Sequence, residues 1–298
     1  MKKTAIRATR GDKWFYAFDY FFMTLFLLIV AYPLVYIISC SFSEPVNVIT
    51  GRVWLLPKGF SLIGYEAVFK YESILTGYLN SIYYTVLGTF INVVMTLMMA
   101  FPLTRKELML RNPISKVVVF TMIFSAGMIP NYILIKNLGL LDTVWALVLP
   151  GAISAYNLMV TRTFIATSIP EEMFEAAKID GSDYFHYLCK IVLPLSKQVI
   201  AVITLFYAVT HWNGYFQAML YINTAAKQPL QLVLRAILVN NQVDSEVFSG
   251  AASDINTQNL YEVLKYAVIV VASLPLMILY PFVQKYFVRG VMIGSVKG

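Results

Sequence analysis

Long apolar stretches alternate with shorter polar connections along the whole chain. Six of these stretches are long enough to cross a bilayer as helices, because a spanning helix needs about 20 residues. They are predicted at residues 16–40, 79–101, 115–137, 142–166, 197–221 and 261–287. Each apolar run is continuous and lacks the two-residue alternation of a membrane β-strand. The pattern therefore predicts an all-α membrane protein with six transmembrane helices.

The third and fourth predicted spans are separated only by residues 137–142, which predicts an antiparallel hairpin. Several spans contain a proline, namely Pro33, Pro130, Pro150 and Pro275. Prolines are tolerated in membrane helices where neighbouring helices or polar side chains satisfy the freed carbonyl groups. The prolines therefore leave the number of predicted spans unchanged.

Composition supports a membrane protein and excludes several chemistries. Hydrophobic residues make up 59% of the chain and charged residues 13%, against about 45–50% and 25% in a soluble domain. Cys40 and Cys189 lie far apart and offer neither a disulfide framework nor a metal-ligand cluster. His186 and His211 are too few for a histidine-based metal site. We therefore predict no metal site.

The basic residues follow the predicted topology, although the net charge of +7 could suggest nucleic acid. They lie between apolar runs instead of forming one patch, so no nucleic-acid partner is predicted. Sixteen of the 23 fall on one side of the predicted membrane, which the positive-inside rule assigns to the cytoplasm. These are Lys2, Lys3, Arg7, Arg10, Lys13, Arg105, Lys106, Arg111, Lys116, Arg162, Lys178, Lys190, Lys197, Lys285, Arg289 and Lys297. Both termini are then cytoplasmic, and residues 41–78 and 222–260 form two external loops.

The amino terminus also has features of a targeting signal, because basic residues precede an apolar run that ends at Cys40. A secretory signal has an apolar region of about 7–15 residues. Here the run exceeds 20 residues and is interrupted by Pro33. We therefore expect the first span to be retained.

A polar, charged segment, Pro170 to Pro194, lies between the fourth and fifth predicted spans and reads PEEMFEAAKIDGSDYFHYLCKIVLP. Ser168 precedes Glu171 with capping-box spacing, and acidic residues favour the positive end of the helix that follows. Gly181 is suited to end that helix in a left-handed conformation, and Ser182 can cap a second helix running toward Leu193. The segment is predicted to form two short helices jointed at Gly181.

Two interpretations compete for this helix pair. It is either an interfacial amphipathic hairpin resting in the lipid headgroups, or a coupling helix inserted into a cleft on a cytoplasmic partner. The small pair Ala176 and Ala177 permits close approach of another backbone, while acidic residues at the tip discourage burial in anionic lipid.

The spacing of Glu175-Ala176-Ala177, Gly181 and Ile191-x-Leu193-Pro194 resembles the EAA loop of ABC importer permeases. The span order and the ending Val291–Gly298 are similar to the sugar-class permeases of that superfamily. His211-Trp212-Asn213-Gly214-Tyr215-Phe216 resembles a segment of the maltose-type inner subunits. Residues 228–235, QPLQLVLR, resemble the subgroup that moves oligosaccharides or polysaccharide fragments.

The resemblance implies one permease domain, residues 1–298, of the type I ABC importer permease fold, in a bacterial or archaeal plasma membrane. Residues 168–196 would form the cytoplasmic EAA coupling loop. The residues implied to couple ATPase closure to the spans are Glu171, Glu172, Glu175, Ala176, Ala177 and Gly181. An external solute-binding protein would deliver a carbohydrate to this chain and a second permease, giving a heterodimer. Because the sequence contains no GxxxxGK[ST] motif, two ATP-binding subunits in trans would hold ATP and Mg²⁺, with no cofactor in this chain.

Sugar recognition pairs aromatic faces with amides and hydroxyls, which selects candidates along the pathway. These are Asn92, Asn131, Tyr132, Asn157, His211, Trp212, Asn213 and Gln217. The amides have a second interpretation as interhelical hydrogen bonds that hold the bundle together. Trp212 and Tyr215 could equally belong to an interfacial aromatic belt. Trp212 with Asn213 is the favoured pair, since an aromatic ring and an amide are adjacent.

Other classes of membrane protein fit the sequence less well. A secondary transporter normally places ionisable residues in mid-membrane, and the apolar runs lack them apart from Arg162 near one end. A membrane enzyme needs a nucleophile, base or metal constellation, and neither histidine has such neighbours. A non-transport scaffold or a channel stays open on composition but does not require the EAA spacing.

Overall fold

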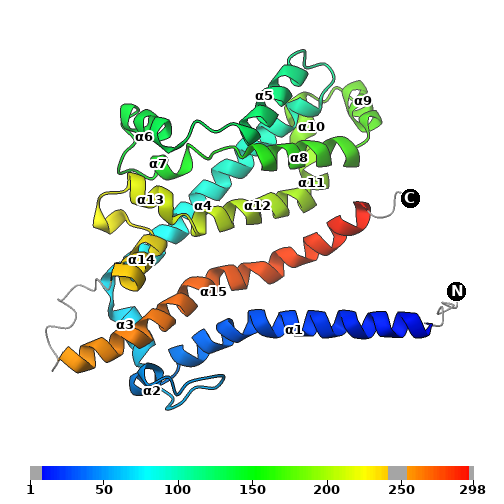
Figure 1. Ribbon diagram of the computed structural model, residues 1–298. Helices are drawn as coiled ribbons and strands as arrows, with labels where there is room; N and C mark the ends of the chain where they lie inside the picture. The colour runs from blue at the N-terminus through cyan, green and yellow to red at the C-terminus, as the bar shows by residue number, and fades with distance from the viewer. Residues whose placement is uncertain (1–8, 241–253, 295–298) are drawn as a thin grey trace. The chain divides into compact units, whose positions relative to one another are not determined.

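The computed structural model describes residues 9–240 and 254–294, and their contacts divide into two compact units. Unit one contains the described residues up to Tyr71 together with residues 254–271. Unit two contains residues 72–240 and 272–294. The described parts of both units are helical, without named strands (Figure 1). The single permease domain over 1–298 stays a prediction.

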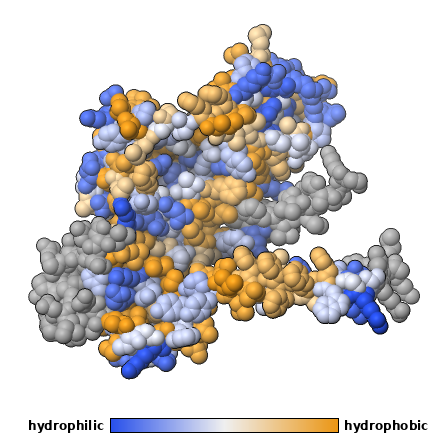
Figure 2. All heavy atoms as spheres, in the orientation of Figure 1, coloured by the Kyte–Doolittle hydropathy of each residue, from blue (hydrophilic) through white to orange (hydrophobic). Residues whose placement is uncertain are grey.

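Unit one consists of α1 (Arg10–Ser41), α2 (Pro45–Ile49), α3 (Ile63–Lys70) and the first part of α15 (Asp254–Gly294). A capping box starts α1, because Thr9 Oγ1 accepts from the Asp12 amide at 3.2 Å and Asp12 Oδ2 accepts from the Thr9 amide at 2.7 Å. Beyond its polar start, most of α1 presents an uncovered apolar surface (Figure 2). Such a surface suits a bilayer, whose core has no water to solvate polar groups.

Unit two holds the remaining elements and every residue of the predicted coupling loop. Its first part contains α4 (Glu72–Ala100), the 3₁₀ turn η1 (Pro102–Thr104), α5 (Arg111–Ile123), α6 (Met128–Asn137), α7 (Trp145–Val148) and α8 (Ala155–Ser168). Next come α9 (Glu171–Ile179), α10 (Tyr184–Tyr187), the π-helical η2 (Leu188–Val192) and α11 (Leu193–Leu195). The unit continues with α12 (Lys197–Trp212), α13 (Tyr215–Tyr221), η3 (Ala225–Lys227) and α14 (Leu230–Asn240).

The central helix of unit two is α4, which packs against α8, α12 and α14. Small residues allow these close approaches. A Cβ atom on Gly77 would lie 3.2 Å from the Leu230 Cα atom, and one on Gly88 would lie 2.5 Å from His211 Nε2. A buried hydrogen bond of 2.7 Å joins the hydroxyl groups of Thr96 and Tyr207 between α4 and α12. Such small and polar contacts are typical of helix packing within membranes.

Three of the predicted spans coincide with helices that are long and apolar enough to cross a membrane. These helices are Arg10–Ser41, Glu72–Thr104 and Leu260–Pro281, matching the predictions at 16–40, 79–101 and 261–287. Two bent helix pairs raise the number to at most five among the described residues. The predicted number of six spans is therefore not confirmed.

The other three predicted spans are wrong as continuous helices. In the span at 115–137, α5 and α6 meet at 116°, with Gly127 at a φ of 85°. The span at 142–166 is divided between the short α7 and the 14-residue α8, and 14 residues cover only about 21 Å. The span at 197–221 breaks after Trp212, and α12 instead forms a pair bent by 82° with Tyr184–Leu195.

The prolines show why the apolar pattern overestimated continuity. Pro33 and Pro275 do lie inside helices, as expected. Pro130 instead falls in the first turn of α6 and Pro150 falls outside any helix, between α7 and α8. A proline lacks the amide hydrogen and disfavours helical geometry in the residue before it, so each can mark a helix boundary. The expected hairpin of two full helices across residues 137–142 is therefore replaced by a turn leading into short helices.

Candidate functional site

The segment between α8 and α12 forms two short helices with a sharp joint at Gly181, as predicted. The first helix, α9, has Glu171 and Glu172 in its first turn and Lys178 in its last, which suits the helix dipole. At its end, the Ser182 amide donates to the Ala177 carbonyl at 2.9 Å and the Gly181 amide to the Lys178 carbonyl at 3.1 Å. This is a Schellman motif, and the φ of 78° at Gly181 supplies its left-handed residue.

The predicted caps of both helices are wrong by one or two residues. Ser168 is the last residue of α8 and Pro170 occupies the N-cap position of α9, so the expected capping box at Ser168 does not form. The second helix is capped by Asp183 instead of Ser182. Asp183 Oδ1 accepts from the His186 amide at 2.6 Å. Aspartate is at least as good an N-cap as serine, and the Ser182 hydroxyl instead donates to the Asp183 carbonyl at 3.3 Å.

The second helix runs from Tyr184 through the π-helical stretch Leu188–Val192 to Leu195. Pro194 lies in its last turn, near the predicted entry to the next span. π-Helical turns within α-helices are rare and are frequent at functional sites. The two-helix architecture predicted for the segment is therefore present, with an irregular second helix.

An arginine surrounded by aromatic rings fixes α9 to the end of α4. The Arg105 guanidinium carbon lies 4.8 Å from the ring centre of Phe174, 5.4 Å from that of Phe101 and 5.8 Å from that of Tyr187. The Phe174 ring also contacts Tyr184 and Tyr187, with centroid separations of 5.4 and 5.1 Å. We call these five residues the Arg105 cluster. Only 8% of Arg105 is exposed, so the cluster forms a compact joint beneath α9.

The predicted coupling residues divide between the two faces of α9. Ala177 faces inward and is buried beside Phe174, which was not among the predicted residues, whereas Glu172, Glu175 and Ala176 are exposed. Of the two alanines expected to permit close approach of another backbone, only Ala176 is therefore accessible to a partner. Ile179 at the tip of α9 is 87% exposed, which places an apolar side chain beside the acidic face.

Hydrophilic surface gathers over the part of unit two that carries α9 and the start of α5 (Figure 2). Within it, a depression of about 480 Å³ follows the joint between the two helices. Gly181, Asp183, His186 and Lys190 are among its lining residues. The depression offers a partner charged groups of both signs next to a defined backbone turn.

Lys106 forms an ion pair with Glu171 at the start of α9. The Glu171 carboxylate accepts a hydrogen bond from the ammonium group, which raises the pKa of Lys106 above its ordinary value. Lys106 is 70% exposed and Glu171 41% exposed, so water and salt screen the pair. The ion pair of Glu171 with Lys106 is therefore an exposed and weak connection to α9. The buried Arg105 cluster connects α9 to the end of α4 more strongly.

Among the pathway candidates, the structure brings together Asn92 of α4 and His211 of α12. Asn92 is buried, its Nδ2 donates to the Gly151 carbonyl at 2.8 Å, and its Oδ1 lies 3.3 Å from His211 Nε2. Gly88 makes room for the imidazole ring. Both side chains therefore join helices within unit two, as the bundle-packing interpretation of the amides requires.

The favoured pair, Trp212 and Asn213, points in two directions. Trp212 is buried, its Nε1 donates to the Ala272 carbonyl at 3.0 Å, and the edge of its ring meets Tyr78. Asn213 is exposed, and its Nδ2 donates to the Val209 carbonyl at 3.0 Å. The indole of Trp212 thus packs within this chain, whereas the side chain of Asn213 is exposed.

The remaining pathway candidates are scattered through unit two. Tyr132 stacks on Tyr221 with ring centroids 6.2 Å apart. Asn131 and Gln217 are exposed, and Asn157 is buried in α8. The described residues do not bring these side chains into one site with Asn92 and His211. Their pathway role stays a prediction.

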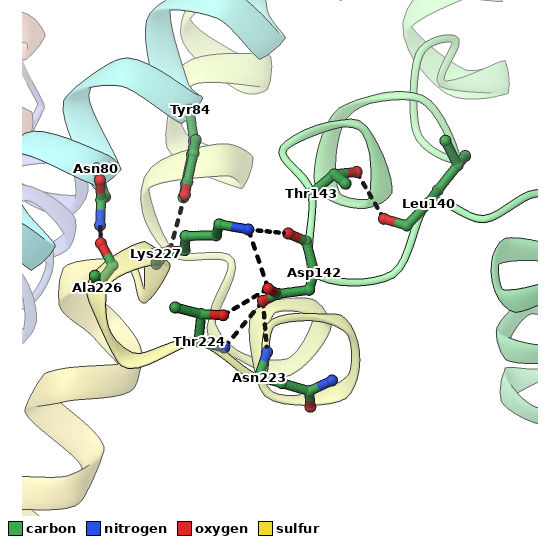
Figure 3. Close-up of polar contacts among 9 residues, drawn as sticks. All are labelled: Asn80, Tyr84, Leu140, Asp142, Thr143, Asn223, Thr224, Ala226 and Lys227. Atoms are coloured by element: carbon green, nitrogen blue, oxygen red, sulfur yellow. Dashed lines mark hydrogen bonds and ion pairs between the residues drawn. The ribbon is translucent and has the colours of Figure 1, made fainter.

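Asp142 holds a second joint that the sequence did not reveal. In the turn after α6 its φ is 60°, a left-handed value rare outside glycine. Its carboxylate accepts hydrogen bonds from the amides of Asn223 and Thr224, at 3.0 and 2.9 Å, and from the Thr224 hydroxyl, at 2.6 Å (Figure 3). Lys227 Nζ lies 3.0 Å from Asp142 Oδ2. These hydrogen bonds hold the pKa of Asp142 well below its usual range.

The segment that Asp142 grips is also fastened to α4. Tyr84 Oη donates to the Lys227 carbonyl at 2.8 Å, and Asn80 Nδ2 donates to the Ala226 carbonyl at 2.9 Å (Figure 3). We call Asp142 with residues 223–228 the Asp142 interlock. The span prediction puts Asp142 at the start of the fourth span, and no local pattern pairs a lone aspartate with a segment some 80 residues later.

Long apolar helices together with an exposed polar helix pair indicate an integral membrane protein. Residues 4–293 match the family described as binding-protein-dependent transport system inner membrane component. The chain belongs to this family. Its resemblance to sugar-class permeases of ABC importers is thereby confirmed.

Two relatives from Bacillus subtilis (strain 168) are similar over nearly the whole chain. The polygalacturonan/rhamnogalacturonan transport system permease protein YtcP is 44% identical, over 94% of this chain and 96% of its own length. Protein LplC is 43% identical, over 89% of each chain. A solved bacterial ABC transporter involved in the import of the acidic polysaccharide alginate aligns with a TM-score of 0.88 and 34% identity. That alignment covers 95% of this chain and all of the other.

Proposed function

We propose that this chain is the membrane-spanning permease subunit of an ATP-driven ABC importer and that α9 with α10 couples ATPase closure to the spans. The observation that carries the proposal is a helix fixed on one face and open on the other. Phe174 and Ala177 fasten α9 to its own chain, while Glu172, Glu175 and Ala176 are free to contact a partner. Rigid-body motion of the partner can then pass to α4 without being absorbed by a flexible loop.

The proposed assembly has a second permease subunit, two ATP-binding subunits in trans and an external solute-binding protein. The ATP-binding subunits supply ATP, Mg²⁺ and the hydrolytic step, since the sequence contains no GxxxxGK[ST] motif. The excess of basic residues on the side that carries Arg105, Lys106 and Lys178 supports a cytoplasmic position for the coupling loop. Residues 2–7 and 297, used to place the termini, lie outside the described part of the chain.

The proposed cargo is an oligosaccharide or polysaccharide fragment that carries carboxylates. Two similar proteins are named for such polymers, polygalacturonan/rhamnogalacturonan in one case and alginate in the other. A more distant relative, 26% identical, is named for the uptake of the neutral sugars melibiose, raffinose and stachyose. The higher identities favour acidic over neutral fragments.

Purification of the assembled complex tests the coupling role. The chain is co-expressed with the products of its neighbouring genes and purified by a tag on this chain alone. We expect an ATP-binding subunit to copurify, and substitutions Gly181→Val and Glu175→Lys to abolish uptake. A complex without an ATPase, or uptake unchanged by both substitutions, contradicts the proposal.

A glycan panel tests the cargo. The partner solute-binding protein is titrated with trigalacturonate, an alginate trimer and raffinose as the neutral control. We expect binding of at least one acidic trimer and none of raffinose. Preferential binding of raffinose contradicts the acidic cargo and leaves the coupling role standing.

A further inference from the structure

Arg105 is a buried cation whose neighbours come from three parts of the chain. Phe101 follows directly on the end of α4 and Arg105 follows η1, while Phe174 comes from α9 and Tyr187 comes from α10. The guanidinium therefore contacts α9, α10 and the residue that follows α4, and the Tyr187 ring supports the same junction through Phe101 and Phe174, with centroid separations of 6.1 and 5.1 Å. Arg105 Nε also donates to Thr104 Oγ1 at 3.1 Å, which fixes its orientation.

The segment that carries Arg105 is held independently of the coupling loop. Thr104 Oγ1 donates to the Phe101 carbonyl at 2.7 Å, and Arg162 of α8 donates from Nε to the Leu103 carbonyl at 3.0 Å. Leu103 is buried with 2% exposure. Residues 101–105 can therefore keep their conformation when contacts to α9 change, so Arg105 is separable from the folding of its own segment.

The chemistry of the cluster favours arginine over lysine. A guanidinium is planar and weakly hydrated, so it can stack on several ring faces in a water-poor site, whereas an ammonium holds its water strongly. Among the described ion pairs, none includes Arg105, so ring faces are its main counterpart. A cation–π contact is kept when the ring turns slightly within its own plane, but it resists separation of the cation from the ring. This property suits a joint that must transmit force.

We propose that Arg105 is the positioning residue that transmits movement of the coupling helices to α4. The inference rests on the proposed coupling role of α9 and adds the route by which its movement reaches a spanning helix. Arg105 is buried under α9 and acts through Phe174 and Tyr187. Its loss should therefore leave the exposed docking face in place and break the connection behind it.

The test compares two activities of the complete importer in proteoliposomes, with trigalacturonate as the transported probe. Variants are Arg105→Met, which keeps the apolar stem, and Arg105→Lys, which keeps the charge. Lys116→Met is the matched control, because Lys116 is an exposed cation on α5. We expect Arg105→Met to reduce uptake about tenfold while ATP hydrolysis stays within about twofold of the unaltered complex. Arg105→Lys should fall between the two, and Lys116→Met should match the unaltered complex.

A double substitution separates coupling from a general loss of stability. Phe174→Leu combined with Arg105→Met should lower the ratio of uptake to hydrolysis no further than Arg105→Met alone, since both act at one contact. Additive losses overturn the proposal, as does an uptake that falls in proportion to hydrolysis. If Arg105→Met does not assemble, Arg105→Lys is judged by the same ratio, and an unchanged ratio there overturns it.

Failure of this inference differs visibly from failure of the proposed coupling role. If Gly181→Val and Glu175→Lys abolish uptake while both Arg105 variants transport with an unaltered ratio, the loop couples by another route and only the inference fails. If the ATP-binding subunit never copurifies with the unaltered chain, the coupling role itself fails.

Discussion

Two joints fasten segments to opposite ends of α4, and they are built from opposite chemistry. The Arg105 cluster lies after the carboxyl end of the helix and stacks a buried cation on aromatic rings. The Asp142 interlock lies near its amino end, beside Asn80 and Tyr84, and uses charge-assisted hydrogen bonds at the surface. About 20 residues of helix, roughly 30 Å, separate them. Arg105 and Phe174 are buried, although Tyr184 at the edge of their cluster is exposed, whereas the Asp142 interlock stays in contact with water.

This difference determines what each joint resists. Salt screens exposed charges over about 8 Å at physiological ionic strength and acts weakly on buried groups. The Asp142 interlock should therefore weaken with salt and the Arg105 cluster should not. A segment that must move with a partner benefits from a joint whose cation is buried, whereas a surface loop needs only to keep its shape.

The largest effect is expected from removing the central ring of the Arg105 cluster. Phe174→Ala deletes a ring that is 5% exposed, and such changes cost about 3–5 kcal/mol. Hydrogen exchange of the α9 and α10 amides should accelerate by about a hundredfold or more, and uptake should be lost. Phe185→Ala is the control, because that ring is 70% exposed. Equal protection in the two variants would show that the cluster does not hold the loop.

The second effect concerns the Asp142 interlock. Asp142→Ala removes every acceptor for Asn223 and Thr224 and introduces a residue that tolerates the φ of 60° poorly. Asp142→Asn keeps an acceptor oxygen and a side chain that tolerates this conformation. Exchange of the Thr224 amide should rise about tenfold in Asp142→Ala and less in Asp142→Asn. Equal rates in the two variants would assign the effect to the charge alone, against the geometry described.

The interlock should also be independent of pH across the physiological range. A carboxylate whose pKa is lowered by folding contributes stability that is complete above its unfolded pKa, about 3.9, and is lost as the pH falls through the folded value. Thr224 protection should therefore be unchanged from about pH 8 to pH 5 and decline only in stronger acid. A midpoint near neutral pH would contradict the role of Asp142.

A smaller effect is expected at the joint between the coupling helices. Gly181 has a φ of 78°, and a Cβ atom there would meet no described atom within 4 Å. Gly181→Ala should therefore cost only its backbone strain, about 1 kcal/mol, and Gly181→Asn less. Gly151→Ala is the control, with equal space and no positive φ. The hydrogen-exchange rate of the Ser182 amide reports the motif, and identical rates in all three variants would contradict the left-handed turn.

The smallest effect is expected from the exposed tether between Lys106 and Glu171. Their exposed fractions of 70% and 41% leave the pair screened by water. The raised pKa of Lys106 means that its contribution is complete below its ordinary pKa and is lost only as the pH rises through the higher value. Lys106→Met should leave uptake and α9 exchange unchanged. A loss similar to that of Phe174→Ala would show that the exposed pair is the real anchor.

The sequence predicted local features better than long-range ones. The jointed helix pair followed from Gly181, because a left-handed glycine after a helix has a specific local cause. Ser168 failed as a cap because α8 extends through it, which leaves Pro170 at the N-cap position without a side-chain hydrogen bond. Ser182 failed because Asp183 was an equally good local candidate. Apolar runs located the helices of three spans but could not show that Gly127 and Pro150 break two others.

Neither joint could be predicted from local sequence pattern, because the contacts of each are made by residues far apart in the chain. Arg105 was counted only as a topology signal, because nothing near it in sequence indicates the ring of Phe174. The apolar pattern predicts Asp142 as the start of a span, while its partners follow some 80 residues later. Trp212 was interpreted as a pathway residue from its neighbour Asn213, but its contact with Ala272 is a tertiary one.

Cross-linking at two adjacent alanines tests the central claim most directly. Ala176 is exposed on the proposed docking face and Ala177 is buried against its own chain. Ala176→Cys and Ala177→Cys are introduced separately after Cys40 and Cys189 are replaced by serine, and the assembled importer is treated with a short thiol-to-amine cross-linker. The account predicts a cross-link to the ATP-binding subunit from position 176 and none from 177. A cross-link from 177 alone, or from neither position in an active complex, would contradict it.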